Sequence, residues 1–314
     1  MRPRILIIDK VNDILLQRLK NAGHEIVLAQ SLSEQEVIEI IKDFNGIIIR
    51  SRFKITPEII DRGINLKFIA RLGSGMESID VEYCRKKNII CINSPEGNRD
   101  SVGEHCMGML LSLLNNLNKA DKEVKNGIWL REDNRGVEIM GKTVGIIGYG
   151  NTGSRFARKL SGFESKVISY DKYKKNYEDG YTTEVNMTEI FKEADVVSLH
   201  VPLTEETEYM FNKDFINNFK KNFIFINSSR GPVVNTSDLV AAIKGKKIIG
   251  VGLDVIEYEE TSFEKTNNLK AYSDFCYLAK CDNVILSPHI AGWTHESDYK
   301  LANILADKIL NLKL

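Results

Sequence analysis

Three glycines stand at a spacing that is typical of a phosphate-binding turn. Gly148, Gly150 and Gly153 come directly after an apolar run, Thr143–Ile147, and directly before a helix-like run, Ser154–Leu160. The first glycine permits a tight turn, the second lets a pyrophosphate approach the backbone, and the third lets helix and strand pack closely. The free N–H groups at the helix start attract phosphates. The spacing therefore predicts a dinucleotide site, which also includes Asn151 and Thr152.

A carboxylate stands where the ribose of such a dinucleotide would lie. The next apolar run, Lys166–Tyr170, ends in Asp171, 18 positions beyond Gly153 (171 − 153). A carboxylate there accepts hydrogen bonds from both ribose hydroxyls of NAD and repels the 2′-phosphate of NADP. The alternative interpretation of Asp171 is a solvated strand end, and the nearby lysines leave tolerance of NADP open. We predict NAD as the cofactor.

Residue types that hydride transfer to a 2-oxo acid needs recur at the ends of strand-like runs. The reaction needs a cation for the carboxylate and carbonyl, an acid that protonates the developing alkoxide, and a group that keeps the acid charged. Arg230 follows Phe223–Asn227, Glu259 follows the next strand, and His289 follows Val284–Ser287. Each residue alone could be a surface charge or a capped turn. Because ligands bind outside the carboxyl ends of parallel strands, the three together indicate an active site.

Short apolar runs alternate with helix-length amphipathic stretches along most of the chain. The predicted strands are Ile5–Asp9, Glu25–Leu28, Gly46–Arg50, Phe68–Leu72, Ile89–Asn93, Thr143–Ile147, Lys166–Tyr170, Val196–His200, Phe223–Asn227, Ile248–Asp254 and Val284–Ser287. A capping box begins at Ser33, and Pro57 suits the first turn of another helix. The stretch Ser101–Lys125 is expected to form one extended helix, and the last helix is expected near Thr294–Leu312.

This alternation predicts the α/β class, with two doubly wound parallel sheets, and the glycine turn indicates that the second is of the Rossmann type. A chain of 314 residues is too long for a single core, which also favours two domains. We expect a substrate-binding domain over residues 1–99 and 291–314, because the terminal helix can return to the first sheet. An NAD-binding domain is expected over residues 100–290.

Composition argues against several other classes of protein. Lys plus Arg and Asp plus Glu are both 43, so no overall charge attracts nucleic acid or an anionic membrane. No signal peptide or membrane-length apolar run is present, so we expect a cytoplasmic protein. The five cysteines show no zinc-ligand spacing and are expected to be buried, reduced thiols, with no metal bound: Cys84, Cys91, Cys106, Cys276 and Cys281.

The sequence resembles the D-isomer-specific 2-hydroxyacid dehydrogenase family along nearly its whole length, and within it the phosphoglycerate dehydrogenases without a regulatory domain most closely. The motifs that carry the resemblance are Arg50-Ser51-Arg52, Arg71-Leu72-Gly73-Ser74-Gly75, Ser101-Val102-Gly103-Glu104, Gly141–Gly150, Leu199–Thr204, the segment Asn227–Pro232, Leu253-Asp254-Val255 and Ser287-Pro288-His289. Ordered motifs of this density are specific for the family and less specific for its substrate.

The resemblance implies a flavodoxin-like substrate domain, a Rossmann NAD-binding domain with a cleft between the two, and a role for each matching residue. Arg230 would bind the carboxylate and carbonyl of the substrate, and His289 would be the acid in reduction and the base in oxidation. Glu259 would hydrogen-bond His289 and stabilise its charged form; Glu257 is the nearby competitor. Cofactor contacts are implied for His200, Pro202, Thr207, Ser229, Asp254 and Gly292, and substrate contacts for Arg50, Ser51, Arg52, Arg71, Gly73, Ser74 and Gly75. For His200, a buried hydrogen-bonded histidine is the alternative.

Some positions depart from the family's pattern. The family usually has Glu-Pro where this chain has Glu259-Glu260, and the connection from there to His289 is long. The glycine-rich loop contains Glu77-Ser78 where Asp-Asn is common. Trp293 stands where smaller residues are commoner and would either narrow the substrate pocket or cover it.

The substrate is the least determined part of the prediction. Arg50, Arg52 and Arg71 follow strands of the first domain, and guanidinium groups suit a phosphate. This favours 3-phosphoglycerate and 3-phosphohydroxypyruvate, as in serine biosynthesis, unless the three are strand-end charges or salt-bridge partners. A glyoxylate or hydroxypyruvate reductase is the nearest alternative, and a non-catalytic NAD-sensing scaffold similar to a co-repressor is the alternative from another class.

The same resemblance implies a homodimer. The segment 101–140 would form the interface, although burial between domains also explains its apolar helix, and Arg131 is a candidate to reach the partner's site. The chain ends soon after its last helix, so we expect no regulatory domain and no inhibition by serine through one.

Overall fold

The computed structural model describes residues 3–259 and 268–312, which form two compact units. The N-terminal unit contains residues 3–98 and 293–312, and the central unit contains residues 99–259 and 268–292. These limits lie within two residues of the domain boundaries expected from the sequence. Glu260, one of the departures noted above, lies outside the described residues.

The N-terminal unit is built on a five-stranded sheet with the order β2-β1-β3-β4-β5, in which all pairs are parallel. Its strands are β1 (Arg4–Ile7), β2 (Glu25–Leu28), β3 (Gly46–Ile49), β4 (Phe68–Arg71) and β5 (Ile90–Asn93). Its helices are α1 (Asp13–Asn21), α2 (Glu34–Ile40), α3 (Pro57–Arg62), α4 (Val81–Lys86) and α12 (His295–Leu310). The order reverses between β1 and β3, which is the flavodoxin-like arrangement.

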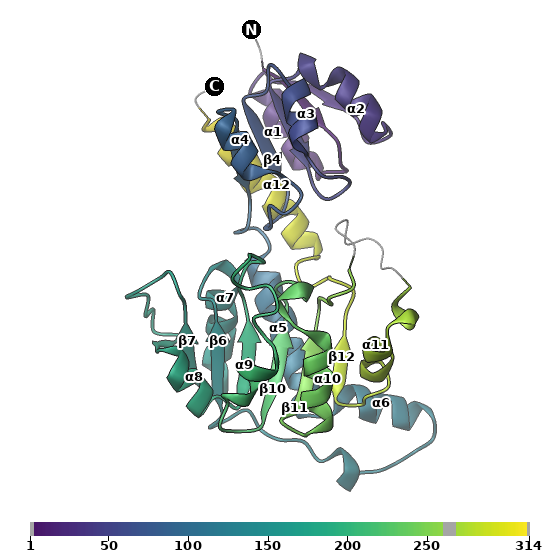
Figure 1. The fold of residues 1–314 in the computed structure, drawn as a ribbon, viewed down its shortest axis with the longest axis vertical. Helices are drawn as coiled ribbons and strands as arrows, with labels where there is room; N and C mark the ends of the chain where they lie inside the picture. The colour runs from purple at the N-terminus through teal and green to yellow at the C-terminus, as the bar shows by residue number, and fades with distance from the viewer. Residues whose placement is uncertain (1–2, 260–267, 313–314) are drawn as a thin grey trace. The chain divides into compact units, whose positions relative to one another are not determined.

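Alternating side chains of these strands fill two cores, one on each face of the sheet. Ile5, Ile7 and Ile48 pack with residues of α1 and α12, whereas Leu6 and Ile47 pack with residues of α2, α3 and α4. A strand buried on both faces reads as a continuous apolar run, as these do in the sequence. The yellow helix α12 lies among the purple and blue elements of this unit (Figure 1), so the chain returns to the first sheet at its last helix.

Two helices of this unit begin where the sequence indicated. The hydroxyl of Ser33 accepts from the backbone N–H of Glu36, while the Glu36 carboxylate accepts from the backbone N–H of Ser33. This capping box satisfies donors that have no partner inside α2. Pro57 is the first residue of α3, where its missing N–H costs nothing.

The central unit is built on a seven-stranded parallel sheet with the order β12-β11-β10-β9-β6-β7-β8. Its strands are β6 (Thr143–Ile147), β7 (Lys166–Tyr170), β8 (Thr183–Glu184), β9 (Val196–Leu199), β10 (Phe223–Asn227), β11 (Ile248–Leu253) and β12 (Val284–Leu286). Its helices are α5 (Arg99–Leu114), α6 (Leu117–Lys125), α7 (Asn151–Leu160), α8 (Met187–Glu193), α9 (Lys213–Asn217), α10 (Thr236–Lys244) and α11 (Ser273–Leu278). The order reverses between β6 and β9, as in the Rossmann fold, and ligands bind at that point.

Helices cover both faces of this second sheet. Helices α5 and α7 pack on one face, around a core that includes Leu110, Phe156 and Ile226. Helices α8 to α11 pack on the other face, around a core rich in phenylalanine. The loops at the carboxyl ends of the strands are thereby held by a rigid scaffold from both sides.

The single helix expected over Ser101–Lys125 is wrong, because the chain breaks between α5 and α6. Asn116 adopts a left-handed backbone conformation with φ of +52°, and the side-chain amide of Asn115 donates to the carbonyl of Leu111. Asparagine enters this conformation more readily than most residues and bonds nearby backbone groups, so it ends helices. Seven residues of α5 between Val102 and Leu114 are buried, whereas α6 has no buried residue.

Other expectations concern membranes, metals and thiols. Among the described residues, no helix combines the length and the apolarity needed to cross a membrane. Within the same residues no cluster of three or more histidine, cysteine or acidic side chains could hold a metal ion. All five cysteines are free thiols, but only Cys84 and Cys106 are buried.

Candidate active site

The glycine turn between β6 and α7 has the geometry that a dinucleotide phosphate needs. Gly148 has φ of +93°, and a Cβ atom there would lie 2.5 Å from the carbonyl oxygen of His200. A Cβ on Gly153 would lie 2.1 Å from the carbonyl oxygen of Gly148, so helix and turn are in close contact. By contrast, a Cβ on Gly150 would meet nothing within 4 Å. The side of the turn at Gly150 is therefore open to a ligand.

Helix α7 begins at Asn151, and no side chain caps its start. Its first N–H groups can therefore donate hydrogen bonds to an anion. Thr152 in this first turn lies 3.1 Å from Nδ1 of His200, through its hydroxyl oxygen. The Nε2 atom of His200 lies 2.9 Å from the hydroxyl of Ser198.

His200 is therefore a buried, hydrogen-bonded histidine directly after β9, next to the phosphate turn. Only 8% of it is exposed, and burial lowers its pKa to about 3. The imidazole is neutral at physiological pH and links the turn to the end of β9.

Asp171, the residue predicted to bind ribose, lies at the carboxyl end of β7. Its carboxylate accepts three backbone N–H bonds, at 2.8 Å from Tyr149 and at 2.9 Å each from Tyr173 and Lys174. Burial raises the pKa of this carboxyl, but these bonds and the charge of Lys174 outweigh burial and hold the pKa below its usual value. Asp171 is thus ionised and fixed beside the glycine turn, as a ribose acceptor must be.

The loop after β9 closes on itself through a threonine. The hydroxyl of Thr207 donates to the carbonyl of Pro202 at 2.6 Å and accepts the backbone N–H of Thr204 at 2.8 Å. Both predicted cofactor contacts, Pro202 and Thr207, therefore lie in one ordered turn at the same edge of the sheet as Asp171.

Asn227, which the sequence did not single out, organises the loop that carries Arg230. Its side-chain oxygen accepts the N–H of Ser229 at 3.0 Å and the hydroxyl of Ser229 at 2.7 Å, and its side-chain amide donates to the carbonyl of Arg230 at 3.0 Å. A guanidinium N–H of Arg230 also donates to the carbonyl of Ser229 at 2.7 Å. Asn227 is fully buried at the end of β10, so the loop is held from beneath.

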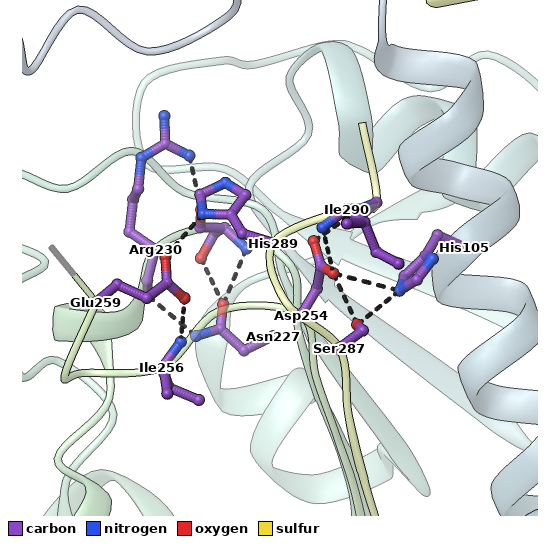
Figure 2. A network of polar contacts seen from close by, with 11 residues as sticks. His105, Asn227, Arg230, Asp254, Ile256, Glu259, Ser287, His289 and Ile290 are labelled. Atoms are coloured by element: carbon purple, nitrogen blue, oxygen red, sulfur yellow. Dashed lines mark hydrogen bonds and ion pairs between the residues drawn. The ribbon is translucent and has the colours of Figure 1, made fainter. Parts of the chain in front are cut away.

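The catalytic candidates Glu259 and His289 meet in a direct hydrogen bond. Nδ1 of His289 lies 2.7 Å from Oε2 of Glu259, with 23% and 13% of the two side chains exposed. The other carboxylate oxygen of Glu259 accepts the backbone N–H of Ile256 at 2.6 Å. Figure 2 shows the guanidinium of Arg230 and the imidazole of His289 on the same side of these loops. The three residues predicted to share the chemistry are therefore brought together.

Glu257, the competitor for the partner role, is committed elsewhere. Its carboxylate accepts the hydroxyl of Tyr209 at 2.9 Å and the backbone N–H of Thr236 at 3.0 Å. It serves the start of α10 and not the imidazole of His289.

Asp254 binds the backbone of the loop that carries His289. It is 1% exposed, and its carboxylate accepts the N–H of Ile290 at 2.9 Å, the N–H of Ala291 at 2.8 Å and the hydroxyl of Ser287 at 2.7 Å. Asp254 therefore fixes this loop up to the residue before Gly292, whatever contact it makes with a cofactor. His105 of α5 lies against the hydroxyl of Ser287 and the carboxylate of Asp254, and no sequence motif indicated these contacts (Figure 2).

In the N-terminal unit, two of the arginines predicted to bind substrate are held by the protein itself. The guanidinium of Arg50 forms an ion pair with Asp298 at 2.8 Å and lies 4.5 Å from the ring centre of Trp293. The guanidinium of Arg52 donates to the carbonyls of Ile8, Ala29 and Leu32. Ser51 between them is half-buried.

The loop after β4 is also ordered by internal contacts. Arg71 is 7% exposed, and its Nε donates to the carbonyl of Arg50 at 3.1 Å. Gly73 has a φ of +153°, which residues with a Cβ rarely adopt, and a Cβ there would lie 2.0 Å from the guanidinium of Arg71. The hydroxyl of Ser74 donates to Asn98 at 2.7 Å, and Gly75 beside it is half-buried.

Comparison with known proteins agrees with this geometry. Residues 107–291 match the profile described as D-isomer specific 2-hydroxyacid dehydrogenase, NAD binding domain. A hydroxypyruvate reductase of Thermotoga maritima is 34% identical, over 98% of this chain and 97% of the relative. A D-3-phosphoglycerate dehydrogenase of Methanocaldococcus jannaschii is also 34% identical, over 98% of this chain but only 56% of the relative. The chain spans 57% and 54% of two further proteins of that name.

A solved structure gives the same result for the fold. The D-lactate dehydrogenase from Aquifex aeolicus, complexed with NAD and lactic acid, aligns with a TM-score of 0.82 and 30% identity over 98% of this chain and 94% of that chain. The open side of Gly150, the uncapped start of α7 and the ionised Asp171 all fit NAD. The chain therefore belongs to the D-isomer-specific 2-hydroxyacid dehydrogenase family, and its central unit is an NAD-binding domain.

Proposed function

We propose that the protein interconverts a small unphosphorylated D-2-hydroxy acid and its 2-oxo acid, with NAD as the hydride carrier and hydroxypyruvate or glyoxylate as the preferred oxo acids. The observation that supports this most is the 2.7 Å bond between His289 and Glu259, on the side of the loops where Arg230 also lies. An acid, its charged partner and a guanidinium are what 2-oxo acid reduction needs from a protein.

Each of these residues has a separate task. Arg230 binds the substrate carboxylate and polarises the carbonyl, since its planar guanidinium matches a carboxylate. His289 gives a proton to the carbonyl oxygen in reduction and removes it in oxidation. Because Nδ1 is bonded to Glu259, the proton passes through Nε2. Glu259 orients the ring and stabilises its positive charge, while NAD, when bound, supplies or accepts the hydride.

The internal partners of Arg50 and Arg52 favour a substrate without phosphate. A guanidinium that already serves an aspartate or three carbonyls has fewer donors left for a phosphate. The similarity to the hydroxypyruvate reductase, over nearly the whole of both chains, points in the same direction.

The second candidate is 3-phosphoglycerate oxidation, the first choice from the sequence. It is supported by three arginines, of which Arg50 and Arg52 follow β3 and Arg71 ends β4, and by the similarity to phosphoglycerate dehydrogenases. A panel of 2-oxo acids with NADH separates the two candidates. We expect kcat/KM for hydroxypyruvate or glyoxylate to exceed that for 3-phosphohydroxypyruvate by about tenfold or more; the reverse order would overturn our choice of substrate.

The non-catalytic scaffold is a weaker interpretation, because such a protein has no need for the His289–Glu259 pair. Steady consumption of NADH with any 2-oxo acid, abolished by His289→Asn, is the expected result. NADH binding without turnover by the wild-type protein would instead support the scaffold.

We also propose that the protein forms a homodimer through the segment that follows α5. Several large apolar side chains of this segment are exposed, namely Leu117, Val124, Ile128, Trp129, Leu130, Val137 and Met140. Exposed apolar surface of this extent usually marks an interface. Arg131 lies in the same segment and is exposed, so it remains a candidate for contact with the partner's site.

A further inference from the structure

The backbone of His289 has an unusual conformation that its surroundings must maintain. Its φ is +55°, which residues other than glycine seldom adopt. The N–H of His289 donates to the backbone carbonyl of Asp254 at 2.8 Å and to that of Ser287 at 3.1 Å. Strained backbone of this kind persists only where neighbouring groups fix it. The position of the imidazole therefore depends on contacts outside the loop itself.

The carboxylate of Asp254 supplies such contacts on both sides of His289. Ser287, two residues earlier, donates its hydroxyl, and Ile290 and Ala291 donate their backbone N–H groups. Because Asp254 is 1% exposed, water cannot replace these bonds. Asp254 acts as a single anchor for the whole turn.

His105 extends this anchor to α5. Its Nε2 lies 2.9 Å from the hydroxyl oxygen of Ser287 and 3.4 Å from Oδ1 of Asp254. The hydroxyl hydrogen of Ser287 is used toward Asp254, so the Nε2–H of His105 must be the donor to Ser287. The result is a directed chain, from imidazole N–H to hydroxyl to carboxylate, which Figure 2 shows on the side of Asp254 away from Glu259.

The next residue of α5 makes a similar contact with the other catalytic loop. Sγ of Cys106 lies 3.1 Å from the hydroxyl of Ser228, two residues before Arg230. Cys106 is fully buried, and burial raises its pKa to about 12, so the thiol stays protonated. Adjacent residues of one helix thus touch the loops of His289 and of Arg230.

We propose that His105 is a positioning residue for His289, acting through Ser287 and Asp254 from the rigid helix α5. It touches neither Glu259 nor the reacting imidazole, and its effect is to keep the turn at 287–291 closed. This assignment rests on the proposed function for its effect on turnover, but its effect on the turn can be measured without any substrate.

The test compares His105→Phe with His105→Gln. Phenylalanine keeps an aromatic ring but has no donor, whereas the amide nitrogen of glutamine reaches about as far as Nε2 of histidine and donates. Glu104→Gln is the matched control, because Glu104 is the preceding residue of α5, is exposed, and forms an ion pair with Lys159 at 2.7 Å. Hydrogen exchange of peptides covering 284–292 reports the turn directly, and NADH binding reports the cofactor site.

With His105→Phe we expect several-fold faster exchange of the amides of Ile290 and Ala291, and a fall in kcat of about tenfold with little change in NADH affinity. In His105→Gln, amide exchange and kcat should both be close to the wild-type values. Glu104→Gln should change neither the exchange nor kcat. Unchanged exchange in His105→Phe, or faster exchange with unchanged kcat, would overturn the proposal. Equal losses in the Phe and Gln variants would also overturn it, since the donor would then not matter. If the wild-type protein reduces no 2-oxo acid, the proposed function fails, while the exchange data still decide whether His105 holds the turn.

Discussion

Nδ1 of His289 lies 2.7 Å from Oε2 of Glu259, although the two residues are 30 positions apart and follow different strands. Each side chain also has a second restraint, since Glu259 accepts the N–H of Ile256 and the backbone of His289 is held by Asp254. A general acid that is oriented in this way needs little reorganisation when charge develops on the substrate.

Replacement of Glu259 tests this pair. Glu259→Gln keeps a hydrogen-bond acceptor but removes the charge that stabilises an imidazolium, so we expect kcat for 2-oxo acid reduction to fall by about tenfold or more. Glu257→Gln is the control, because Glu257 bonds Tyr209 and Thr236 instead. Steady-state NADH oxidation measures both. Equal kcat values for the two variants would contradict the role of Glu259.

Replacement of Asp171 tests cofactor choice. Asp171→Asn loses the negative charge and one of the two acceptor oxygens, of which Oδ2 accepts from Tyr149 and Oδ1 from Tyr173 and Lys174. We expect the preference for NADH over NADPH, measured as the ratio of kcat/KM values, to fall by about tenfold. Asp179→Asn, at a nearby carboxylate that bonds Tyr149 through its hydroxyl, should leave the ratio as it is. A preference that survives in Asp171→Asn would place discrimination elsewhere.

Replacement of Arg52 distinguishes a structural from a phosphate-binding arginine. Because its guanidinium serves the carbonyls of Ile8, Ala29 and Leu32, Arg52→Ala should lower the free energy of unfolding of the N-terminal unit by about 2 kcal/mol. The ratio of activities toward phosphorylated and unphosphorylated oxo acids should stay constant. Urea unfolding and the substrate panel measure these two quantities, and Arg85→Ala, at an exposed pair with Glu82, is the control. Selective loss of the phosphorylated substrate would restore the phosphoglycerate interpretation.

The buried imidazole of His200 predicts a dependence of stability on pH. In the unfolded chain it takes up a proton near its ordinary pKa of 6.5, whereas burial lowers the pKa to about 3 in the folded protein. As pH falls from 6.5 toward 3, the unfolded state therefore binds the proton first. The free energy of unfolding should decline by up to about 1.4 kcal/mol per pH unit from this group. Its contribution is fully present above pH 6.5.

His200→Gln should reduce the dependence of the free energy of unfolding on pH by up to about 1.4 kcal/mol per pH unit, measured by urea unfolding between about pH 7 and about pH 4. His295→Gln, at an exposed histidine, is the control. An unchanged slope in His200→Gln would mean that other groups produce the acid sensitivity.

The proposed dimer predicts the effect of a charge within the exposed segment. Trp129 is 76% exposed, so Trp129→Asp should leave folding intact while it weakens association. Sedimentation velocity of the wild-type protein should show a dimer, and the variant should shift toward the monomer. A monomeric wild-type protein would exclude this interface.

Much of the fold could be predicted because each strand of a doubly wound sheet is a short apolar run followed by a turn and a helix. Strands β6, β7 and β10 have the predicted bounds, because a glycine follows the first, an aspartate follows the second, and an asparagine is the last residue of the third. The strand β8 was missed, because Thr183–Glu184 is only two residues long. The break at Asn116 was missed as well, since it depends on the conformation of a single residue within an otherwise helical pattern.

A site residue could be predicted where the local motif places it directly after a strand, as for His289 and Asp171. It was not predictable where the partner is distant or belongs to the backbone. His105 and Ser287 are 182 positions apart and meet only because α5 packs against the end of the sheet. The carbonyls that bind Arg52 belong to loops of the first sheet, and no sequence pattern shows which carbonyls lack a partner.

The two-residue interruption between α5 and α6 has a mechanical consequence. Helix α5 packs on the sheet through its buried residues, whereas α6 has no buried residue and follows a short joint at Asn115 and Asn116. We therefore expect a tilt of α6 to be taken up at the joint, without displacement of His105 or Cys106. The sequence of α6 could therefore change without altering the contacts of His105 and Cys106 with the catalytic loops.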